Sequence, residues 1–312
     1  MTTAGKVQTV LGEIDPSEMG NTLTHDHVFL DAWKLRELYE VILDDESIAI
    51  EELQDFKAAG GGTVCDPTNI GLKRDPEALA RISRASGVNI VMGAGWYREK
   101  TYPDYIASTS TEELARFLVN EIENGAEGTD IKPGFIGEIG TERGHISPIV
   151  ERVFRAAGRA HARTGVPILT HTTHWGELAL EQLDLLAEEG VDPSVVIVSH
   201  LGDRRGIDII LPIAERGAWI NVDNIGFVGG YAPLEFRADN VAELCSRGLA
   251  ERVMLSNDIC ELGQLKAYGG VGYANVIENF LPMLRERGVT EQQIIQMTVT
   301  NPSIAFAFGS PA

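Results

Sequence analysis

Eight short apolar runs, separated by segments with a helical pattern, constrain the fold of this chain more than any other feature. The runs are rich in β-branched residues and span residues 21–27, 61–67, 88–95, 134–140, 166–172, 195–200, 218–223 and 252–258. Segments between them, such as 47–60, 110–125 and 177–190, have apolar residues at spacings of three and four and end in glycine. Strands that are apolar almost throughout and alternate with helices predict a parallel sheet with helices packed against it.

Eight strand–helix units in 312 residues predict a closed (β/α)8 barrel, the TIM barrel of the α/β class. An open doubly wound sheet is the alternative, but it usually carries a glycine-rich phosphate loop after its first strand, and residues 24–34 contain no glycine. No linker, repeat or low-complexity tract divides the chain, so we expect one domain over residues 1–312. Residues 6–20 predict a small N-terminal β-hairpin that covers the barrel from below.

The charge balance excludes several classes of partner. The chain has 26 Lys and Arg against 46 Asp and Glu, a formal net charge of −20, whereas nucleic acids and anionic membranes bind basic surfaces. A small-molecule substrate therefore remains. No apolar run approaches the ~20 residues that span a bilayer, and the start lacks the apolar core of a signal peptide, so we expect a cytoplasmic protein. Cys65, Cys245 and Cys260 are too scattered for a disulfide framework or a cysteine-based zinc site.

Side chains that can bind metal ions gather at the ends of the predicted strands, where barrel enzymes place their active sites. The first run ends in a His-Asp-His motif, and its two histidines share a face if the strand continues through them. The candidates at these ends are His25, His27, Glu138, His171, His200 and Asp258. Each could be structural when taken alone. Independent structural roles do not explain why four of the seven histidines and two acids occur at one end of the barrel.

The chemistry of these six side chains suits divalent metal ions. Imidazole and carboxylate ligands bind Zn²⁺, Mn²⁺, Co²⁺ or Fe²⁺. Glu138 lies among Phe135, Ile136 and Ile139, where a buried carboxylate is costly unless a cation compensates it. Two ions about 3.5–4 Å apart need an anionic bridge, which Glu138 can provide, and together they lower the pKa of a shared water. The residues therefore predict two divalent ions, zinc being the first choice, that activate water for attack on a carbonyl or phosphoryl centre.

These motifs and their order resemble the phosphotriesterase-like group of the metal-dependent amidohydrolase superfamily, which includes phosphotriesterase-related proteins and lactonases. The resemblance covers nearly the whole chain and rests on LTHDH, GFIGEIGTE, ILTHT, VIVSHLGDR, MLSNDIC and NPSIAF. It implies that Asp258 and both histidines of LTHDH hold the more buried ion, that His171 and His200 hold the more exposed ion, and that Glu138 bridges the two together with a hydroxide. It also implies that Asp258 accepts the proton of the attacking water, and it suggests a homodimer.

The resemblance bears on further residues. The best-known relatives have a carboxylated lysine where this chain has Glu138, so the chain resembles the phosphotriesterase-related branch. Tyr97 resembles the tyrosine that lactonases direct at the hydroxide or the substrate carbonyl, and we expect it to be catalytic along with Asp258; simple packing is the alternative. Asn224 falls where lactonases often carry an arginine. The long glycine-rich segment 260–275 is expected to determine specificity.

Four polar residues near the predicted mouth have open roles. Asp203 and Arg204 could orient His200 or contact the substrate, because metal-bound imidazoles normally have an outer partner, or they could form a salt bridge within a loop. His145 and His174 follow the fourth and fifth strands, and we expect solvated loop residues there.

We expect a binuclear metal hydrolase that attacks a carbonyl with a bridging hydroxide, and lactones or other carboxylic esters are the leading substrates. Hydrolysis of N-acyl amides, or weak phosphoester hydrolysis, on the same site is the alternative. A leaving amine must be protonated, so an additional acid such as His174 or His145 near the mouth would favour amides. A metal-binding receptor or scaffold is the non-enzymatic alternative, and the presence of all six candidate ligands argues against it.

Overall fold

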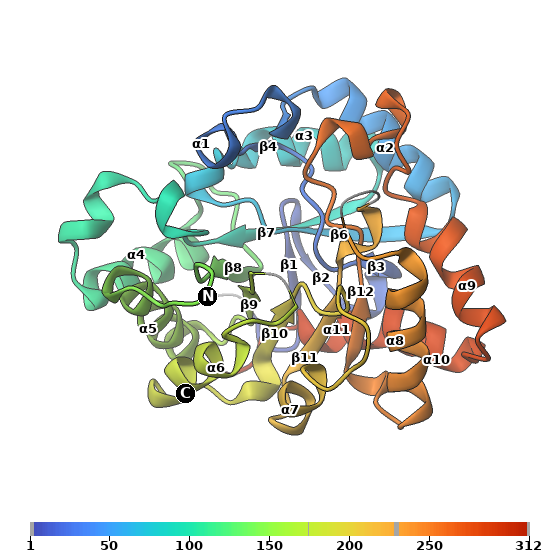
Figure 1. Cartoon of the computed structure of the whole chain (residues 1–312). Helices are drawn as coiled ribbons and strands as arrows, with labels where there is room; N and C mark the ends of the chain where they lie inside the picture. Colours follow the sequence, from blue (N-terminus) through green and yellow to red (C-terminus); the bar gives the residue numbers. More distant parts are fainter. Residues whose placement is uncertain (1–2, 174, 228–230, 311–312) are drawn as a thin grey trace.

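The computed structural model describes residues 3–173, 175–227 and 231–310. Within these ranges eight parallel strands form one curled sheet at the centre of the molecule, and helices cover its outside (Figure 1). In order around the sheet the strands are β3 (Asn21–Leu23), β6 (Gly61–Asp66), β7 (Asn89–Ala94), β8 (Phe135–Gly140), β9 (Ile168–His171), β10 (Val196–Ser199), β11 (Trp219–Val222) and β12 (Val253–Leu255). Each lies inside the run predicted for it, and each neighbours the next in sequence. The predicted (β/α)8 barrel is confirmed, and a doubly wound sheet, whose strand order reverses, is wrong.

The barrel closes between its first and last strands through bonds that lie beyond the ends of both. The backbone N–H of Asp258 donates to the carbonyl of His25 at 3.1 Å, and the N–H of His27 donates to the carbonyl of Ile259 at 2.9 Å. The carboxylate of Asp26 accepts hydrogen bonds from the N–H groups of Asn257 and Ile259 across the same seam. The middle residue of the His-Asp-His motif therefore joins the two edges of the barrel.

Helices follow the strands and pack around the barrel. They are α2 (Glu46–Ala58), α3 (Pro76–Ser86), α4 (Thr111–Asn124), α5 (Pro148–Thr164), α6 (Ala179–Glu188), α7 (Ile210–Glu215) and α8 (Leu234–Ser246), with α9 (Leu281–Glu286), α10 (Glu291–Ile295) and α11 (Asn301–Ala305) after the last strand. Helix α4 shows why they begin where they do, because Ser110 and Glu113 form a reciprocal capping box at its first turn. No helix in the described ranges is long and apolar enough to cross a bilayer.

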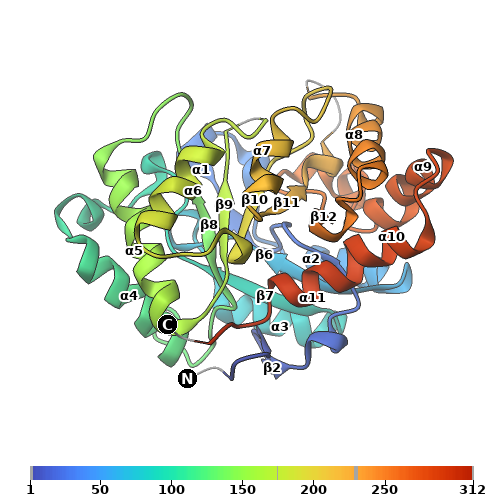
Figure 2. The same cartoon turned by 90° about the horizontal axis from the view of Figure 1, so that it is seen from below.

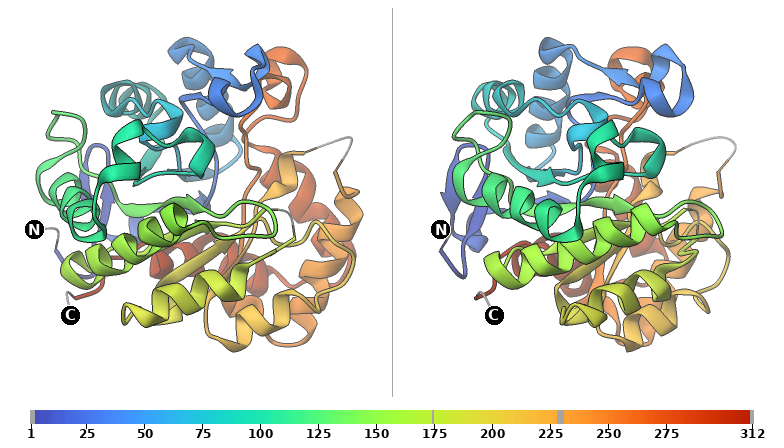
Figure 3. Two further views of the ribbon diagram at one scale, coloured as in Figure 1. Left: turned by 60° about the vertical axis from the view of Figure 1, so that its left-hand side comes forward. Right: turned by 90° about the vertical axis from the view of Figure 1, so that its left-hand side faces the viewer.

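The predicted N-terminal hairpin is confirmed. It covers the end of the barrel where the strands begin, opposite their C-terminal ends. Strand β1 (Val7–Thr9) pairs antiparallel with β2 (Gly12–Ile14), and the hairpin lies at the edge of the molecule in Figure 2. Val7 packs in an apolar cluster with Phe135, at the start of β8, and with Phe306. The two ends of the chain lie on the same side (Figure 3), where the N–H of Gly5 donates to the carbonyl of Phe308.

The connection between β3 and α2 contains structure that the periodicity did not predict. Strand β4 (Leu30–Asp31) pairs antiparallel with β5 (Ile42–Leu43), and the single-turn helix α1 (Trp33–Arg36) lies between them. Arg36 forms an ion pair with Glu261, in the glycine-rich segment after β12. The first and the last connections of the barrel therefore meet beside its mouth.

Candidate active site

The six predicted ligand residues converge at the C-terminal ends of the strands. They come from the segment after β3, from the middle of β8, from the last residue of β9, and from the residues that follow β10 and β12. None of His25, His27, Glu138, His171, His200 and Asp258 is more than 8% exposed. The expectation that the two histidines of the LTHDH motif lie on a strand is wrong, because β3 ends at Leu23. Both imidazoles nevertheless approach the same carboxylate.

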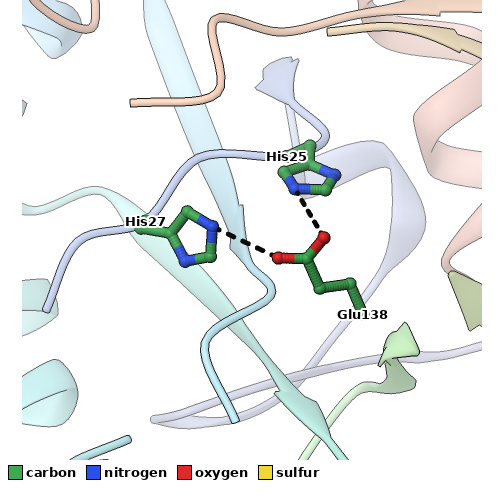
Figure 4. Close-up of side chains that lie close together, drawn as sticks. All are labelled: His25, His27 and Glu138. Carbon is green, nitrogen blue, oxygen red and sulfur yellow. Dashed lines mark ion pairs between the residues drawn. The ribbon is translucent and has the colours of Figure 1, made fainter. Parts of the chain in front are cut away.

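That carboxylate belongs to Glu138 and lies between two pairs of histidines. Its Oε2 is 3.4 Å from Nε2 of His25, and its Oε1 is 3.4 Å from Nε2 of His27 (Figure 4). On the other side, Oε2 is 3.0 Å from Nδ1 of His171 and 3.6 Å from Nε2 of His200. The carboxylate and either pair form a group whose ligand atoms all lie within 4.8 Å of one another. One acid shared by two such groups is the geometry that a bridging ligand requires.

Asp258 faces the first pair of histidines and also approaches His200. Its Oδ1 is 3.7 Å from Nε2 of His25 and 3.8 Å from Nε2 of His27, and its Oδ2 is 3.9 Å from Nδ1 of His200. The backbone of Asp258 has a φ of 56°, and that of His200, after β10, has a φ of 64°. Residues other than glycine rarely adopt such positive φ values, and the residues that do so concentrate at functional sites. The two turns place both side chains in the mouth of the barrel.

The first two histidines have the hydrogen-bonding pattern of metal ligands. Nε2 of His25 is buried and has no hydrogen-bond partner among the described residues, while Nδ1 of the same ring is 3.1 Å from Oγ of Ser199. Nδ1 of His27 is 2.7 Å from Oγ1 of Thr68. Each ring thus has one nitrogen held from outside and the other directed at Glu138, as ligating imidazoles do. The donor set and the unpartnered nitrogen fit divalent metal ions.

Asp223 is a site residue that the sequence reasoning missed. It follows β11, and its Oδ1 accepts a hydrogen bond from the N–H of His200 at 2.8 Å and lies 3.0 Å from Nδ1 of that ring. Its Oδ2 is 3.3 Å from Nδ1 of His25. Asp223 ends the seventh predicted strand run, so the rule that found the other ligands could also have found this residue.

The interpretation of Asp203 as the partner of His200 is wrong, because Asp223 occupies that position. Asp203 instead pairs with Arg237 and accepts a hydrogen bond from Asn224. Arg204 is exposed on its loop. His145 is exposed as expected, and its Nδ1 lies 3.2 Å from the carbonyl of Arg143. His174 lies outside the described residues.

Charges in the cluster shift several pKa values. Burial alone would lower the pKa of His25, but Glu138 and Asp223 outweigh burial and raise this pKa to about 10. Burial would raise the pKa of Glu138, but the surrounding imidazoles, His25 first, hold it well below its usual range. Burial lowers the pKa of His171 to about 3, helped by His200. Without metal, protons on imidazoles therefore compensate the buried carboxylates.

A cavity of about 430 Å³ opens over the cluster. Tyr97 lines it and is 9% exposed, and its hydroxyl oxygen lies 3.3 Å from the ring nitrogens of His171. Arg98 also lines the cavity, paired with Glu142. The remaining wall is partly apolar and includes Leu30, Leu72, Phe227, Tyr231 and Cys260. A small molecule can therefore reach the carboxylate–histidine cluster from the C-terminal side of the barrel.

Comparisons with known proteins agree with this geometry. Residues 5–306 match the model of the phosphotriesterase family. The chain is 39% identical over 292 residues to the phosphotriesterase homology protein of Escherichia coli (strain K12), covering 94% of this chain and 99% of that protein. It is 33% identical over 343 residues to the N-acetyltaurine hydrolase of Homo sapiens, covering 96% and 97%. The crystal structure of a lactonase from Listeria monocytogenes superposes with a TM-score of 0.92 at 30% identity, covering 98% of this chain and 100% of that chain.

The barrel, the buried cluster of histidines and carboxylates at its mouth and these relatives together place the protein in the class of TIM-barrel hydrolases. Within that class this chain belongs to the phosphotriesterase family, as the order of its motifs predicted.

Proposed function

We propose that this protein hydrolyses a small carbonyl compound with the help of two divalent metal ions, zinc being the first choice. The position of Glu138 carries the proposal, because its carboxylate lies between two pairs of histidines and within reach of all four imidazoles. The pair His25 and His27, together with Asp258, would hold one ion, and His171 with His200 would hold the other. When bound, such ions lower the pKa of a water molecule toward neutrality and polarise the carbonyl of the substrate.

Two side chains have further roles in this proposal. Burial, the largest influence on Asp258, raises the pKa of its carboxyl against the opposing effect of the nearby histidines. A carboxylate with a raised pKa accepts a proton from the attacking water more readily and can return it to the leaving group. The hydroxyl of Tyr97 stays protonated because burial raises its pKa well above the usual value. It would donate a hydrogen bond to the substrate carbonyl from the wall of the cavity.

Two classes of carbonyl substrate are candidates. Lactones and other carboxylic esters, which the sequence analysis places first, are supported by the lactonase that superposes over nearly the whole chain. N-acyl amides are supported by the similarity to an N-acetyltaurine hydrolase. Phosphoesters are a weaker alternative on the same site.

The test is a metal titration followed by a substrate panel. The protein is stripped of metal, reconstituted with Zn²⁺, Mn²⁺ or Co²⁺, and its metal content is measured by elemental analysis. The reconstituted protein is then assayed on lactones, aryl esters, N-acyl amides and phosphotriesters. We expect close to two ions per chain and hydrolysis of at least one carbonyl class. Failure to take up transition metal, or hydrolysis of phosphotriesters alone, would overturn the proposal.

A further inference from the structure

Asn224 presents a polar side chain to the cavity from a buried network that fixes its orientation. Arg237, on α8, is fully buried, and its Nε donates to Oδ1 of Asp203 at 2.6 Å. The other carboxylate oxygen of Asp203 accepts a hydrogen bond from Nδ2 of Asn224. Asn224 follows β11 directly after Asp223 and is 4% exposed at the cavity wall. The network therefore runs from the outer helix layer to the cavity.

The chemistry of the network decides which atom of the amide faces the cavity. A carboxylate paired with arginine only accepts hydrogen bonds, so the atom of Asn224 that faces Asp203 is the donor Nδ2. Reversing the amide would set its oxygen against the carboxylate and leave a buried charge poorly paired. Oδ1 of Asn224 therefore lies on the other branch of the side chain, and no donor within the described ranges hydrogen-bonds to it. The cavity wall beside His200 thus carries a fixed acceptor.

Resting on the proposed function, we propose that Oδ1 of Asn224 accepts a hydrogen bond from the N–H group of a secondary amide substrate, the amide whose carbonyl is hydrolysed. This contact makes the site select N-acyl amides over esters of the same shape. An ester or lactone has an oxygen in place of the N–H group and offers only lone pairs to this acceptor. A site built to pair with a donor discriminates against an analogue that lacks it, because its own polar group is then left unpaired.

The same contact suits the reaction. The oxygen of water bonds to the carbonyl carbon, the carbon–nitrogen bond breaks, and the nitrogen takes up one proton of that water, giving a carboxylic acid and a primary amine. The amide N–H stays on nitrogen throughout, so Asn224 can hold it in the substrate and in the transition state alike. Asp258 can deliver the additional proton to the lone pair that develops on nitrogen.

A purely structural role for Asn224 makes a different prediction. If its side chain only ties the segment after β11 to Asp203, its loss would reduce the hydrolysis of amides and esters by the same factor. The discriminating quantity is therefore the ratio of kcat/KM for an amide to kcat/KM for the matching ester.

The experiment compares wild-type enzyme with Asn224→Leu, which keeps the size of the side chain and removes the acceptor. Matched substrates share the acyl group and the leaving-group skeleton, as in 4-nitroacetanilide with 4-nitrophenyl acetate and N-acetylglycine with O-acetylglycolate. We expect the amide-to-ester ratio to fall about tenfold in the Asn224→Leu variant, the effect of about one lost hydrogen bond. Cys260→Ala, which trims another side chain of the cavity wall, should leave the ratio unchanged.

A second measurement uses only the unmodified enzyme, in case the variant does not fold. N-methylation of the amide, as in N-acetylsarcosine compared with N-acetylglycine, removes the N–H group and should lower kcat/KM by about tenfold or more. Equal rates on both amides, or an unchanged ratio in Asn224→Leu, or ester hydrolysis with no amide hydrolysis in the wild-type enzyme, would overturn this inference while the proposed hydrolase stands. Absence of any carbonyl hydrolysis by metal-loaded enzyme would instead overturn the proposed function.

Discussion

Glu138 is nearly fully buried and faces four imidazoles, an arrangement that only added positive charge can stabilise. In the metal-free protein that charge comes from protons, as the raised pKa values of His25 and His200 show. Divalent ions would replace the protons and use the same nitrogen atoms as ligands. Protons and metal ions therefore compete for one set of side chains.

The first prediction at this scale concerns the shared carboxylate. Glu138→Gln removes the negative charge and one acceptor, so metal content should fall from two ions toward one or none, and turnover should fall by more than about 100-fold. Glu142→Gln is the matched control, because Glu142 lines the same cavity and pairs with Arg98 rather than with the histidines. Elemental analysis and kcat on the best substrate measure both effects. Full metal content in the Glu138→Gln variant would show that Glu138 does not bridge the two ions.

Asp258 carries the second prediction. If it moves the proton of the attacking water, Asp258→Asn should lower kcat by ~10²–10⁴ while changing KM much less. Metal content must be measured alongside, since loss of a ligand would lower activity for another reason. A variant that retains its metal and turns over normally would leave Asp258 with a structural role at most.

Single residues also show what the sequence could and could not predict. All six candidate ligands lie together because each ends or follows a strand or lies near its end, and a parallel barrel brings such positions to one mouth. The partners of the ligands were harder to predict. Asp203 and Asp223 each lie near a strand end, but Asp203 pairs with Arg237 of α8 and Asp223 contacts His200, and these are tertiary contacts that no local pattern indicates.

At the scale of elements, long periodic segments were predictable and short ones were not. All eight strands fall within their predicted runs because a buried parallel strand is apolar almost throughout. Strands β4 and β5 have two residues each, too few for a repeating pattern, and among the described strands they pair only with each other. The end of β3 before His25 follows from bonds to the segment around the end of β12, 231 residues away in sequence.

The third prediction tests the seam that Asp26 closes. Its carboxylate accepts from the N–H groups of Asn257 and Ile259 and from the hydroxyl of Ser256. An asparagine offers one acceptor oxygen and sets an N–H group against one of these donors, so Asp26→Asn should lower the free energy of unfolding by roughly 1–3 kcal/mol. Urea denaturation of metal-free protein measures this difference. The exposed Asp208→Asn variant should stay within about 0.5 kcal/mol of the wild type. Equal free energies of unfolding for the two variants would contradict the prediction that Asp26 stabilises the closure of the barrel.

At the scale of the whole molecule, metal binding and folding are coupled through the protonation of the centre. Ligands must be deprotonated to bind metal, and ions that bind only the folded state stabilise it. In the folded metal-free protein the pKa of His25 is about 10, because Glu138 and Asp223 outweigh burial, compared with an ordinary value of 6.5. A raised histidine pKa adds stability that is fully present below about pH 6.5 and is lost as the pH rises through about 10. The metal-free protein therefore loses this contribution over the range in which metal ions bind more tightly.

The last prediction follows from these opposite trends. The difference in Tm between metal-loaded and metal-free protein should widen steadily from about pH 6 to about pH 9, because each proton that metal must displace weakens its apparent affinity about tenfold per pH unit below the relevant pKa. Differential scanning fluorimetry with and without saturating Mn²⁺ measures it. His161→Gln is the control, since His161 lies on α5 with its Nδ1 2.7 Å from the carbonyl of Val166, and it should leave the slope unchanged. A difference in Tm that is constant with pH would show that the histidines at the mouth exchange no protons when metal binds.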